Sequence, residues 1–330
     1  MNKHDTQQLH HYLTSKHKEV KYLETHISHI FITPAYTYKI KKSVKTSFLD
    51  FSSLSLRKKY CFEELRLNQR LTKDVYLFVQ ALTKKGQQVS FEPNGEIVEY
   101  AVVMHTLPQD KLMSTLLEQN KVNKKHVEIL AERVADFHKT ADIVPGAFST
   151  ERYRNDFNDL RSIKEIIEKY LGSDGVDTIE EAIAYSCEHL QESQFLYKKR
   201  AEEGFFRDLH GDLHSGNIFL LPEPVIFDCI EFNKGFRTID TLNEIAFLSM
   251  DLEAFGHWGL SKAFIDSYHS AFPSYDPKKE QHLLQYYKLY RACVRLKVIL
   301  LGIEDTFPHK KFNRYYDLIQ KYLNNTQPIF

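Results

Sequence analysis

One short segment, residues 208–232, holds the side chains whose types and spacing best suit catalysis. Asp212 and Asn217 lie five positions apart, and Asp228 follows after a turn that contains two prolines. Transfer of a phosphoryl group from a nucleotide needs a carboxylate that orients the attacking hydroxyl, together with oxygen ligands for a Mg²⁺ ion that bridges the phosphates. An Asp and an Asn at this spacing can supply the first role and part of the second, and an Asp at the end of the next strand can complete the metal site.

The same segment admits other interpretations. A zinc hydrolase could use the His and Asp side chains of 210–228, but the sequence offers no matching second His pair. Asp208 heads a second Asp-Leu-His, yet the residue five positions after it is Leu213, which cannot bind a metal. The polar residues could also simply cap turns, which the matched spacing and the hairpin make less favoured.

The elements around this segment predict a sheet followed by helices. Apolar residues at 218–220 and 225–227 form the strands of a hairpin, and Pro222 and Pro224 lie in its turn. Upstream, alternation within 20–42 and at 75–82 and 97–104 indicates strands, while 52–71 has helical periodicity with Ser52 or Ser53 as its cap. A short helix is expected at 6–17. Five later stretches have helical patterns: 110–140, 151–171, 176–203, 238–271 and 277–301.

Composition excludes several classes of protein. The chain has 330 residues, and its 44 Lys and Arg balance its 44 Asp and Glu, so neither nucleic acid nor a membrane surface is expected as a partner. The N-terminus has no apolar export signal, and no apolar stretch approaches the roughly 20 residues that span a bilayer. The four cysteines form no C-x-x-C pair, which favours a reduced, cytoplasmic location.

The catalytic segment also carries a family resemblance. H-G-D-L-H-S-G-N, from His210 to Asn217, resembles the catalytic loop of aminoglycoside phosphotransferases and choline kinases, which are relatives of the protein kinases. T-H-I-S, Y-K-I-K-K, E-E-L-R-L-N, L-P-Q-D and I-F-D-C-I-E-F-N resemble an uncharacterised bacterial branch of these proteins, with similarity from about Glu24 to about Val298. Some members of that branch carry a further P-loop domain, and because no G-x-x-x-x-G-K-[ST] occurs here, that second activity is expected to be absent.

The resemblance implies an α+β, protein-kinase-like fold with two lobes. Residues 1–104 would form a small, sheet-rich nucleotide-binding lobe, and residues 105–330 a larger, mainly helical catalytic and substrate lobe. In the large lobe the resemblance makes Asp212 the catalytic carboxylate, Asn217 and Asp228 the Mg²⁺ ligands, and His210 the residue that orients the loop. It further suggests that Arg237 and Asp240 brace this loop, and that acids on the following helix face the acceptor.

In the small lobe, kinases pair a strand lysine, which holds the phosphates, with a glutamate on the next helix. Lys39 is preferred for this role, with Lys41 on the same side of its strand as a rival. Glu63 and Glu64 point about 100° apart on a helix, so only one can face the lysine, and Glu64 is preferred.

The remaining nucleotide contacts are expected at two places. No G-x-G-x-x-G precedes the lysine, so Ser28 and the backbone amides of the turn at Thr25 would cover the phosphates. Met104 and His105, at the connection between the lobes, would lie against the nucleotide base.

The resulting hypothesis is an ATP- and Mg²⁺-dependent phosphotransferase that acts on a hydroxyl of a small molecule. The alternative is a nucleotide-binding regulatory module of the same fold with little or no transferase activity, suggested by the glycine-poor phosphate loop. The sequence names neither the acceptor nor an oligomeric state, and it leaves ATP and GTP open. Protein kinase activity is disfavoured because the interval between Asp228 and Asp240 is short for an activation segment.

Overall fold

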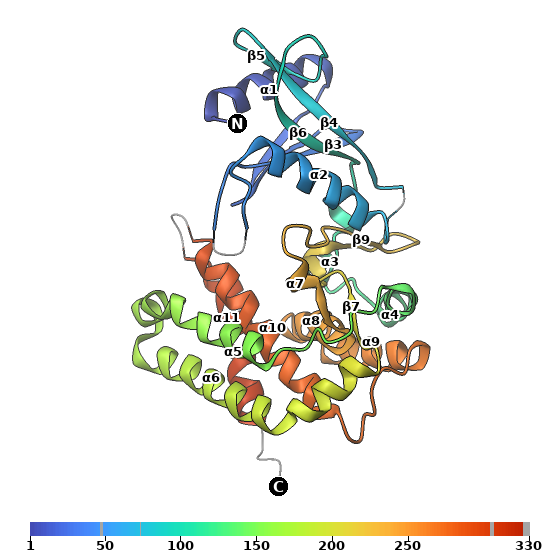
Figure 1. The fold of residues 1–330 in the computed structure, drawn as a ribbon, viewed down its shortest axis with the longest axis vertical. Coiled ribbons are helices and arrows are strands. Elements are labelled where there is room, and N and C mark those ends of the chain that lie inside the picture. The colour runs from blue at the N-terminus through green and yellow to red at the C-terminus, as the bar shows by residue number, and fades with distance from the viewer. Residues whose placement is uncertain (47–48, 73, 304–306, 326–330) are drawn as a thin grey trace. The chain divides into compact units, whose positions relative to one another are not determined.

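The computed structural model describes residues 1–46, 49–72, 74–303 and 307–325 (Figure 1). The chain forms two compact units. The first comprises Met1–Leu112 and Phe219–Phe236, and the second Met113–Ile218 and Arg237–Phe330. The first unit therefore receives a short segment that returns to it after the catalytic loop, in addition to the residues expected for a small lobe.

The first unit is built on an antiparallel sheet of six strands within the described part of the chain, in the order β1-β2-β3-β6-β4-β5. The strands are β1 (Lys21–Glu24), β2 (Ser28–Ile32), β3 (Tyr36–Lys41), β4 (Tyr76–Lys85), β5 (Gln88–Ser90) and β6 (Glu96–His105). Strand β3 pairs with β2 and β6, with Lys39 opposite Ile30 and Val102. This central position fixes the register of the strand that carries the candidate lysines.

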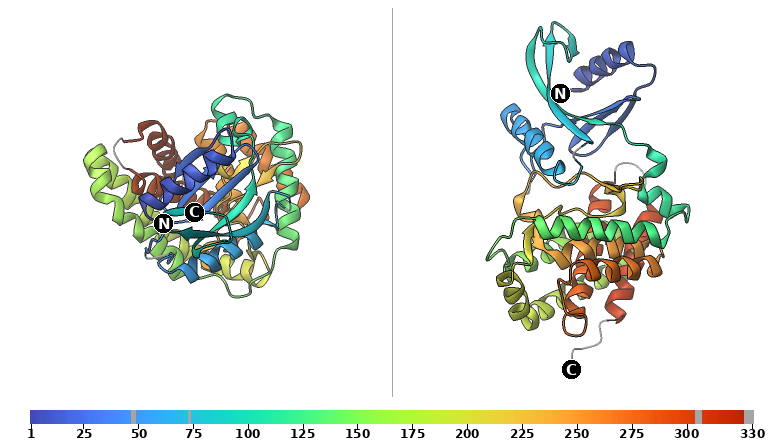
Figure 2. Two further views of the ribbon diagram at one scale, coloured as in Figure 1. Left: turned by 90° about the horizontal axis from the view of Figure 1, so that it is seen from above. Right: turned by 90° about the vertical axis from the view of Figure 1, so that its right-hand side faces the viewer.

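Alternation along β3 and β6 gives the sheet two different faces. Tyr38 and Ile40 belong to a core that includes Leu9 and Leu13 of α1 (Lys3–Lys16). The intervening residues point to the opposite face, where α2 (Leu54–Asn68) packs on β6 and β4 (Figures 1 and 2). Lys39 and Lys41 therefore lie on the α2 side of the sheet, because side chains two positions apart in a strand share a face.

Helices make up most of the second unit. They are α3 (Met113–Glu118), α4 (Lys124–Thr140), α5 (Thr150–Asn158), α6 (Lys164–Glu202), α8 (Thr241–Ala254), α9 (Trp258–Ala271), α10 (Gln281–Leu301) and α11 (His309–Asn325). Helix α8 packs against α9 and α10, and all its residues from Thr241 to Glu253 are buried. A helix that is buried on every side is the core of its unit, so its polar side chains must find partners inside the protein.

The remaining elements are short. They are the strands β7 (Phe206–Asp208), β8 (Ile218–Phe219), β9 (Val225–Ile226) and β10 (Thr238–Asp240), the helix α7 (Lys234–Arg237), and the 3-10 helices η1 (Gln109–Lys111), η2 (Asp159–Ile163) and η3 (Ser215–Asn217). Strand β7 pairs with β10, and β8 pairs with β9. The expected hairpin at 218–227 is thus present as the pair β8–β9, although each strand is only two residues long.

Most of the expected elements are confirmed, with some differences. The stretch 110–140 contains two helices, α3 and α4, and the stretch 238–271 contains α8 and α9. Helix α11 was not anticipated. The expected break between 171 and 176 is present inside α6, where Gly172 has a φ of 68° that interrupts the helical backbone. Ser53, one of the two candidate caps, accepts a hydrogen bond from the Leu56 amide at the start of α2.

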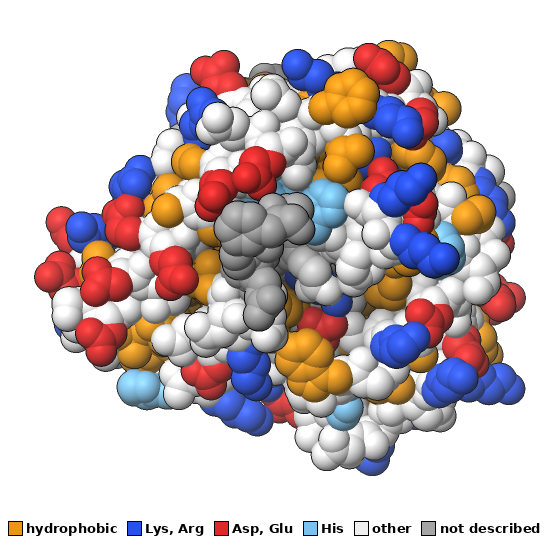
Figure 3. Space-filling view, turned by 90° about the horizontal axis from the view of Figure 1, so that it is seen from below, with side chains coloured by type: hydrophobic (Ala, Val, Ile, Leu, Met, Phe, Trp, Pro, Cys, Tyr) orange, Lys and Arg blue, Asp and Glu red, His pale blue; other side chains and the backbone are white. Residues whose placement is uncertain are grey.

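The surface carries charged side chains of both signs. In Figure 3, which shows the molecule from below, Lys and Arg side chains are interspersed with Asp and Glu side chains. Within the described residues, no helix is both long and apolar enough to cross a bilayer.

Two buried histidines in the second unit predict how stability depends on pH. His138 Nδ1 lies 2.7 Å from the Tyr268 hydroxyl, and His189 Nε2 lies 2.8 Å from the Tyr197 hydroxyl. Burial lowers the pKa of each imidazole to about 3. Below pH 6.5 the unfolded chain therefore binds protons that the folded chain does not. The free energy of unfolding consequently decreases as the pH is lowered. From pH 6.5 to pH 5 we expect a loss of about 3 kcal/mol from the two groups together.

Urea denaturation at the two pH values measures this loss. His189→Phe keeps a ring where the imidazole stacks on Tyr286, with centroids 4.2 Å apart, but removes one titrating group. Between the two pH values this variant should lose about 1.5 kcal/mol less than the parent. Glu244, whose pKa burial raises to about 7, titrates in the opposite sense in parent and variant alike, so an identical pH dependence for both proteins would contradict the prediction.

Candidate active site

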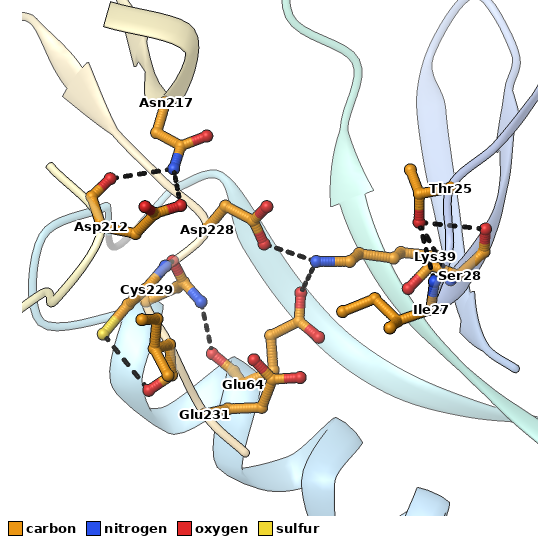
Figure 4. Close-up of polar contacts among 12 residues, drawn as sticks. Thr25, Ile27, Ser28, Lys39, Glu64, Asp212, Asn217, Asp228, Cys229 and Glu231 are labelled. Atoms are coloured by element: carbon orange, nitrogen blue, oxygen red, sulfur yellow. Dashed lines mark hydrogen bonds and ion pairs between the residues drawn. The ribbon is translucent and has the colours of Figure 1, made fainter. Parts of the chain in front are cut away.

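A carboxylate held between two lysines forms the first part of the site. Glu64 on α2 is fully buried, with Oε1 2.8 Å from the Lys39 Nζ (Figure 4). Its Oε2 lies 2.6 Å from the Lys41 Nζ. The neighbouring Glu63 pairs instead with Arg66 on the exposed side of the helix, at 2.7 Å. The structure thus brings Glu64 to both candidate lysines.

Two further carboxylates, both from the segment that follows β9, complete this cluster. Lys39 Nζ donates to Asp228 Oδ1, and Lys41 Nζ donates to Glu231 Oε1. Lys39 therefore contacts Glu64 and Asp228, whereas Lys41 contacts Glu64 and Glu231. The side chain of Lys39 is 12% exposed and that of Lys41 only 1%, so Lys39 is the lysine that a ligand can reach.

The ion pairs keep this cluster charged. Burial alone would lower the pKa of the Lys39 ammonium, but Asp228 and Glu64 outweigh it and raise that pKa. Burial would likewise raise the pKa of Glu64, yet Lys39 and Lys41 lower it to about 2. Glu64 is consequently ionised and the lysines protonated at neutral pH.

Asp228 adopts an unusual backbone conformation. Its φ is +64°, in the left-handed region that non-glycine residues seldom occupy. Its side chain is 40% exposed, although one oxygen binds Lys39. A carboxylate that is partly exposed in this way can accept a further ligand.

The predicted catalytic loop belongs to the second unit. The Asn217 amide nitrogen donates to the Asp212 backbone oxygen at 3.0 Å and to its Oδ2 at 2.9 Å (Figure 4). These bonds fix the Asn217 side chain so that its Oδ1 points away from Asp212. That oxygen has no hydrogen bond among the residues that the structure describes, so it is open to a ligand.

Histidines on both sides of Asp212 set its position and charge. His210 Nδ1 accepts a hydrogen bond from the Asp212 amide at 3.2 Å, and His214 Nε2 lies 3.4 Å from Asp212 Oδ2. Burial raises the pKa of Asp212, but His214, Arg295 and His210 together outweigh it and hold the pKa well below its ordinary value. Asp212 is therefore an ionised carboxylate at neutral pH, suited to orient a hydroxyl.

The acids of α8 hold the backbone of this loop. Glu244 accepts from the His210 amide at 2.7 Å and from the Gly211 amide at 3.0 Å, and Asp251 accepts from the Ser215 amide at 2.8 Å. The family resemblance suggests that acids on this helix face the acceptor. Glu244 and Asp251 instead accept hydrogen bonds from buried amides, because a fully buried helix leaves its carboxylates no solvent.

The two residues expected to brace the loop have other partners. Arg237 Nε donates to Asp208 at 2.9 Å, and its backbone oxygen accepts from the Leu209 amide. Asp240 forms a bidentate pair with Arg200, with both bonds 2.7 Å long. Arg237 thus binds the residues that precede the loop. The ion pair of Asp240 with Arg200 joins α6 to the start of α8.

The oxygen donors suit Mg²⁺ better than zinc. Asn217 offers an amide oxygen and Asp228 an exposed carboxylate, which are the oxygen ligands that Mg²⁺ prefers. Within the described ranges, no group of three or more His, Cys, Asp or Glu residues is placed to hold a metal ion.

Comparison with known sequences finds relatives without an assigned activity. No family model matches the chain. It is similar to uncharacterised proteins of Mycobacterium tuberculosis and Mycobacterium bovis, each 30% identical over 284 residues that cover 83% of this chain and 53% of theirs. The chain thus spans about half the length of the curated relatives it matches.

Comparison with solved structures gives matches along almost the whole chain. A choline kinase from Cryptosporidium parvum has a TM-score of 0.54 at 14% identity, covering 92% of this chain and 88% of its own. The GDP and kanamycin complex of APH(2")-IIia has a TM-score of 0.51 at 13% identity and covers 94% of both chains. Aminoglycoside phosphotransferase APH(4)-Ia has a TM-score of 0.52 at 12% identity, covering 98% of this chain and 99% of its own.

The chain has the fold of the aminoglycoside phosphotransferases and choline kinases. This protein-kinase-like fold consists of an N-terminal antiparallel sheet followed by a mostly helical region, as the sequence predicted. At these identities the likeness establishes the fold alone, and the roles of individual residues stay predictions.

The turn expected to cover the phosphates of this kinase-like fold is tightly bonded to itself. Thr25 Oγ1 accepts from the Ser28 amide at 3.0 Å and from the Ile27 amide at 3.4 Å (Figure 4). These amides are therefore not free for phosphate. Ser28 Oγ is buried and has no hydrogen-bond partner among the described residues, and Ser28 pairs with Lys41, so its side chain shares the sheet face of the lysines.

Two backbone amides at the connection after β6 are already bonded within the first unit. The His105 amide donates to the Val75 oxygen and the Thr106 amide to the Ala35 oxygen. Met104 is buried against Tyr76 and Val102. His105 is exposed, and its ring stacks on that of Tyr36 with the two centroids 5.6 Å apart. Both keep their predicted place at the connection, and their own backbone groups hold the sheet together.

Sequence reasoning missed the polar contacts that hold Asp228 and the second lysine. The sequence groups Glu231 with Asp228 as acids near the metal, since D-C-I-E places them close together after a strand, but it does not predict that Glu231 pairs with Lys41. Asn68 and Tyr76, which contact the backbone after β9, had no local signal, because an Asn at a helix end and a Tyr in a strand are common. Only their tertiary contacts distinguish them.

The contrast between Glu63 and Glu64 yields a prediction. Glu64→Gln removes a charge that two buried lysines share, so we expect about 3–5 kcal/mol of destabilisation. Glu63→Gln removes an exposed pair and should cost at most about 1 kcal/mol. Urea denaturation of the two variants and the parent at pH 7 makes the comparison. Equal losses for the two variants would show that the buried cluster does not stabilise the first unit.

Proposed function

We propose that this protein is a Mg²⁺-dependent phosphotransferase that moves the γ-phosphate of ATP to a hydroxyl of a small molecule. The observation that carries the proposal is the double contact of Lys39 with Glu64 and Asp228. In kinases a lysine paired with a helix glutamate positions the phosphates, beside an aspartate that binds the metal. The catalytic loop adds an ionised Asp212 whose neighbour Asn217 presents a free amide oxygen.

The proposed roles follow from the state of each side chain. Lys39 is protonated and reachable, so it can bind phosphate oxygens in place of part of its contact with Asp228. Asn217 Oδ1 and the Asp228 carboxylate would hold Mg²⁺, which neutralises negative charge on the phosphates when it is bound. Asp212 accepts a hydrogen bond from the acceptor hydroxyl and orients its oxygen toward phosphorus.

Proton transfer from the acceptor hydroxyl accompanies transfer of the phosphoryl group. The bond from the acceptor oxygen to phosphorus forms while the bond from phosphorus to the leaving nucleotide oxygen breaks. The hydroxyl proton passes to Asp212 as the new bond forms. Because the pKa of Asp212 is held low, it is a weak base, and its contribution is mainly orientation.

Relatives support a nucleotide and a small acceptor without naming either for this chain. APH(2")-IIia is known as a complex with GDP and kanamycin, and a GDP complex of an aminoglycoside 2'-phosphotransferase has the same fold. Kanamycin and choline both carry hydroxyl groups. We therefore infer a hydroxylated small molecule as the acceptor and include GTP beside ATP in the test.

One observation favours a second candidate, a nucleotide-binding module with little transfer activity. The amides of Ile27 and Ser28 are already bonded to Thr25, so the turn offers the phosphates few donors. A protein of this kind would bind nucleotide with Mg²⁺ and leave the γ-phosphate in place.

A screen of hydroxylated metabolites and aminoglycosides with Mg²⁺ and ATP or GTP separates the two candidates. The phosphotransferase predicts nucleoside diphosphate release together with a product that is heavier by one phosphoryl group. Tight nucleotide binding without transfer to any member of a broad panel would favour the module instead. Absence of nucleotide binding would contradict both.

Variants of the proposed site give a quantitative prediction for any acceptor that the screen finds. Asp212→Asn should lower kcat by about 10²–10⁴-fold, because the acceptor loses an oriented carboxylate. Asp228→Asn should lower it at least about 10²-fold. Asp266→Asn, which removes an exposed acid paired only with Lys262, is the matched control and should keep full activity. Full turnover in the Asp212 variant would rule out its proposed role.

A further inference from the structure

We propose that Tyr76 and Asn68 are positioning residues that hold Asp228 in the left-handed conformation in which it binds the metal. This inference rests on the proposed function, since it concerns the metal ligand of the same site. Neither residue touches the reacting groups in this arrangement. They act through the backbone of the segment that follows β9.

The first argument is the conformation itself. Asp228 and Asn120 are the non-glycine residues with positive φ in the described part of the chain. Such a conformation costs on the order of 1–3 kcal/mol and persists only where the surrounding structure imposes it. Asn and Asp tolerate it more readily than other side chains. Asn120 lies in a surface turn after α3, whereas two buried side chains bind the backbone at Asp228.

The second argument is that two side chains accept hydrogen bonds from the backbone amides of Asp228 and Cys229. The Asp228 amide donates to the Tyr76 hydroxyl at 3.2 Å, and the Cys229 amide donates to Asn68 Oδ1 at 2.9 Å. Consecutive amides point to two fixed acceptors, so the peptide planes on both sides of the Asp228 Cα are oriented. Fixing these planes fixes φ at Asp228.

The third argument is that both acceptors are rigid. Tyr76 begins β4, is 1% exposed and pairs with Met104. Asn68 is fully buried at the end of α2, and its amide nitrogen donates to the Glu64 backbone oxygen at 2.8 Å. The clamp, meaning Tyr76 and Asn68 together, is thus part of the folded core of the first unit.

The clamp also links the metal carboxylate to the lysines. Helix α2 holds Lys39 and Lys41 through the Glu64 side chain, and one turn later it holds the Cys229 amide through Asn68. A displacement of α2 would therefore change the contacts of Lys39 and of the Asp228 backbone together. Without the clamp, Asp228 would relax to a negative φ and its carboxylate would turn away.

The test uses Tyr76→Phe, which removes one hydroxyl from a buried ring and keeps its packing. Mn²⁺ binding to the nucleotide-bound protein, followed by electron paramagnetic resonance, should weaken by about 10-fold, the equivalent of one lost hydrogen bond. Nucleotide binding in EDTA should stay within about twofold of the parent. Amide hydrogen exchange in the metal-free protein should become faster in the 227–232 segment.

Two further variants make the test specific. Tyr38→Phe is the matched control: Tyr38 is buried on the other face of the sheet, and its hydroxyl has no hydrogen bond among the described residues. It should change neither measurement. Asn68→Leu removes the second acceptor and should reproduce the effects of Tyr76→Phe on metal affinity and exchange.

The outcomes separate this inference from the proposed function. If Tyr76→Phe and Asn68→Leu keep the parent's Mn²⁺ affinity and exchange rates, the positioning role is wrong even where the parent is an active kinase. If the parent itself binds no Mn²⁺ with nucleotide, the proposed function fails. The exchange rates of 227–232, measured without metal, still decide in that case whether the clamp holds the backbone.

Discussion

The structure of the first unit depends on one buried carboxylate, Glu64, shared by two lysines. A charge without a partner in this position would be costly, so the helix that carries Glu64 and the strand that carries Lys39 and Lys41 must keep their relative positions. The cluster has two positive and three negative side chains, because Asp228 and Glu231 complete it. Removing Lys41 would leave the buried Glu231 without its ion-pair partner.

The path of the chain explains how a cluster far from the catalytic loop in sequence receives its acids. After Asn217 the chain enters β8, and the segment 219–236 belongs to the compact unit that contains the sheet. Asp228 and Glu231 reach Lys39 and Lys41 by this return. The two predicted metal ligands thus come from different units, Asn217 from the helical one and Asp228 from the one with the sheet.

The catalytic loop is held by a different principle. Its amides are bound by Glu244 and Asp251, which extend from the buried helix α8, and the Gly211 oxygen accepts from Arg291 of α10 at 3.1 Å. Gly211 has a φ of 87°, a conformation that a side chain would strain. Rigid helices therefore fix the loop backbone, while the side chains of Asp212 and Asn217 remain oriented toward each other. Glu244 and Asp251, which the sequence suggested as acids facing the substrate, instead bind the backbone of the loop.

The sequence by itself determined the spacing of Asp212, Asn217 and Asp228, the alternation that puts Lys39 and Lys41 on one face, and the order of sheet and helices. These features are local, since they follow from the period of a strand or helix and from residue types along one loop. Only the tertiary structure decided that Glu64 rather than Glu63 faces the lysines. Helical geometry fixes the angle between neighbours, but the rotation of α2 about its axis is set by its packing on β6 and β4. The contacts of Glu231, Asn68 and Tyr76 likewise join segments distant in sequence, and no local pattern encodes them.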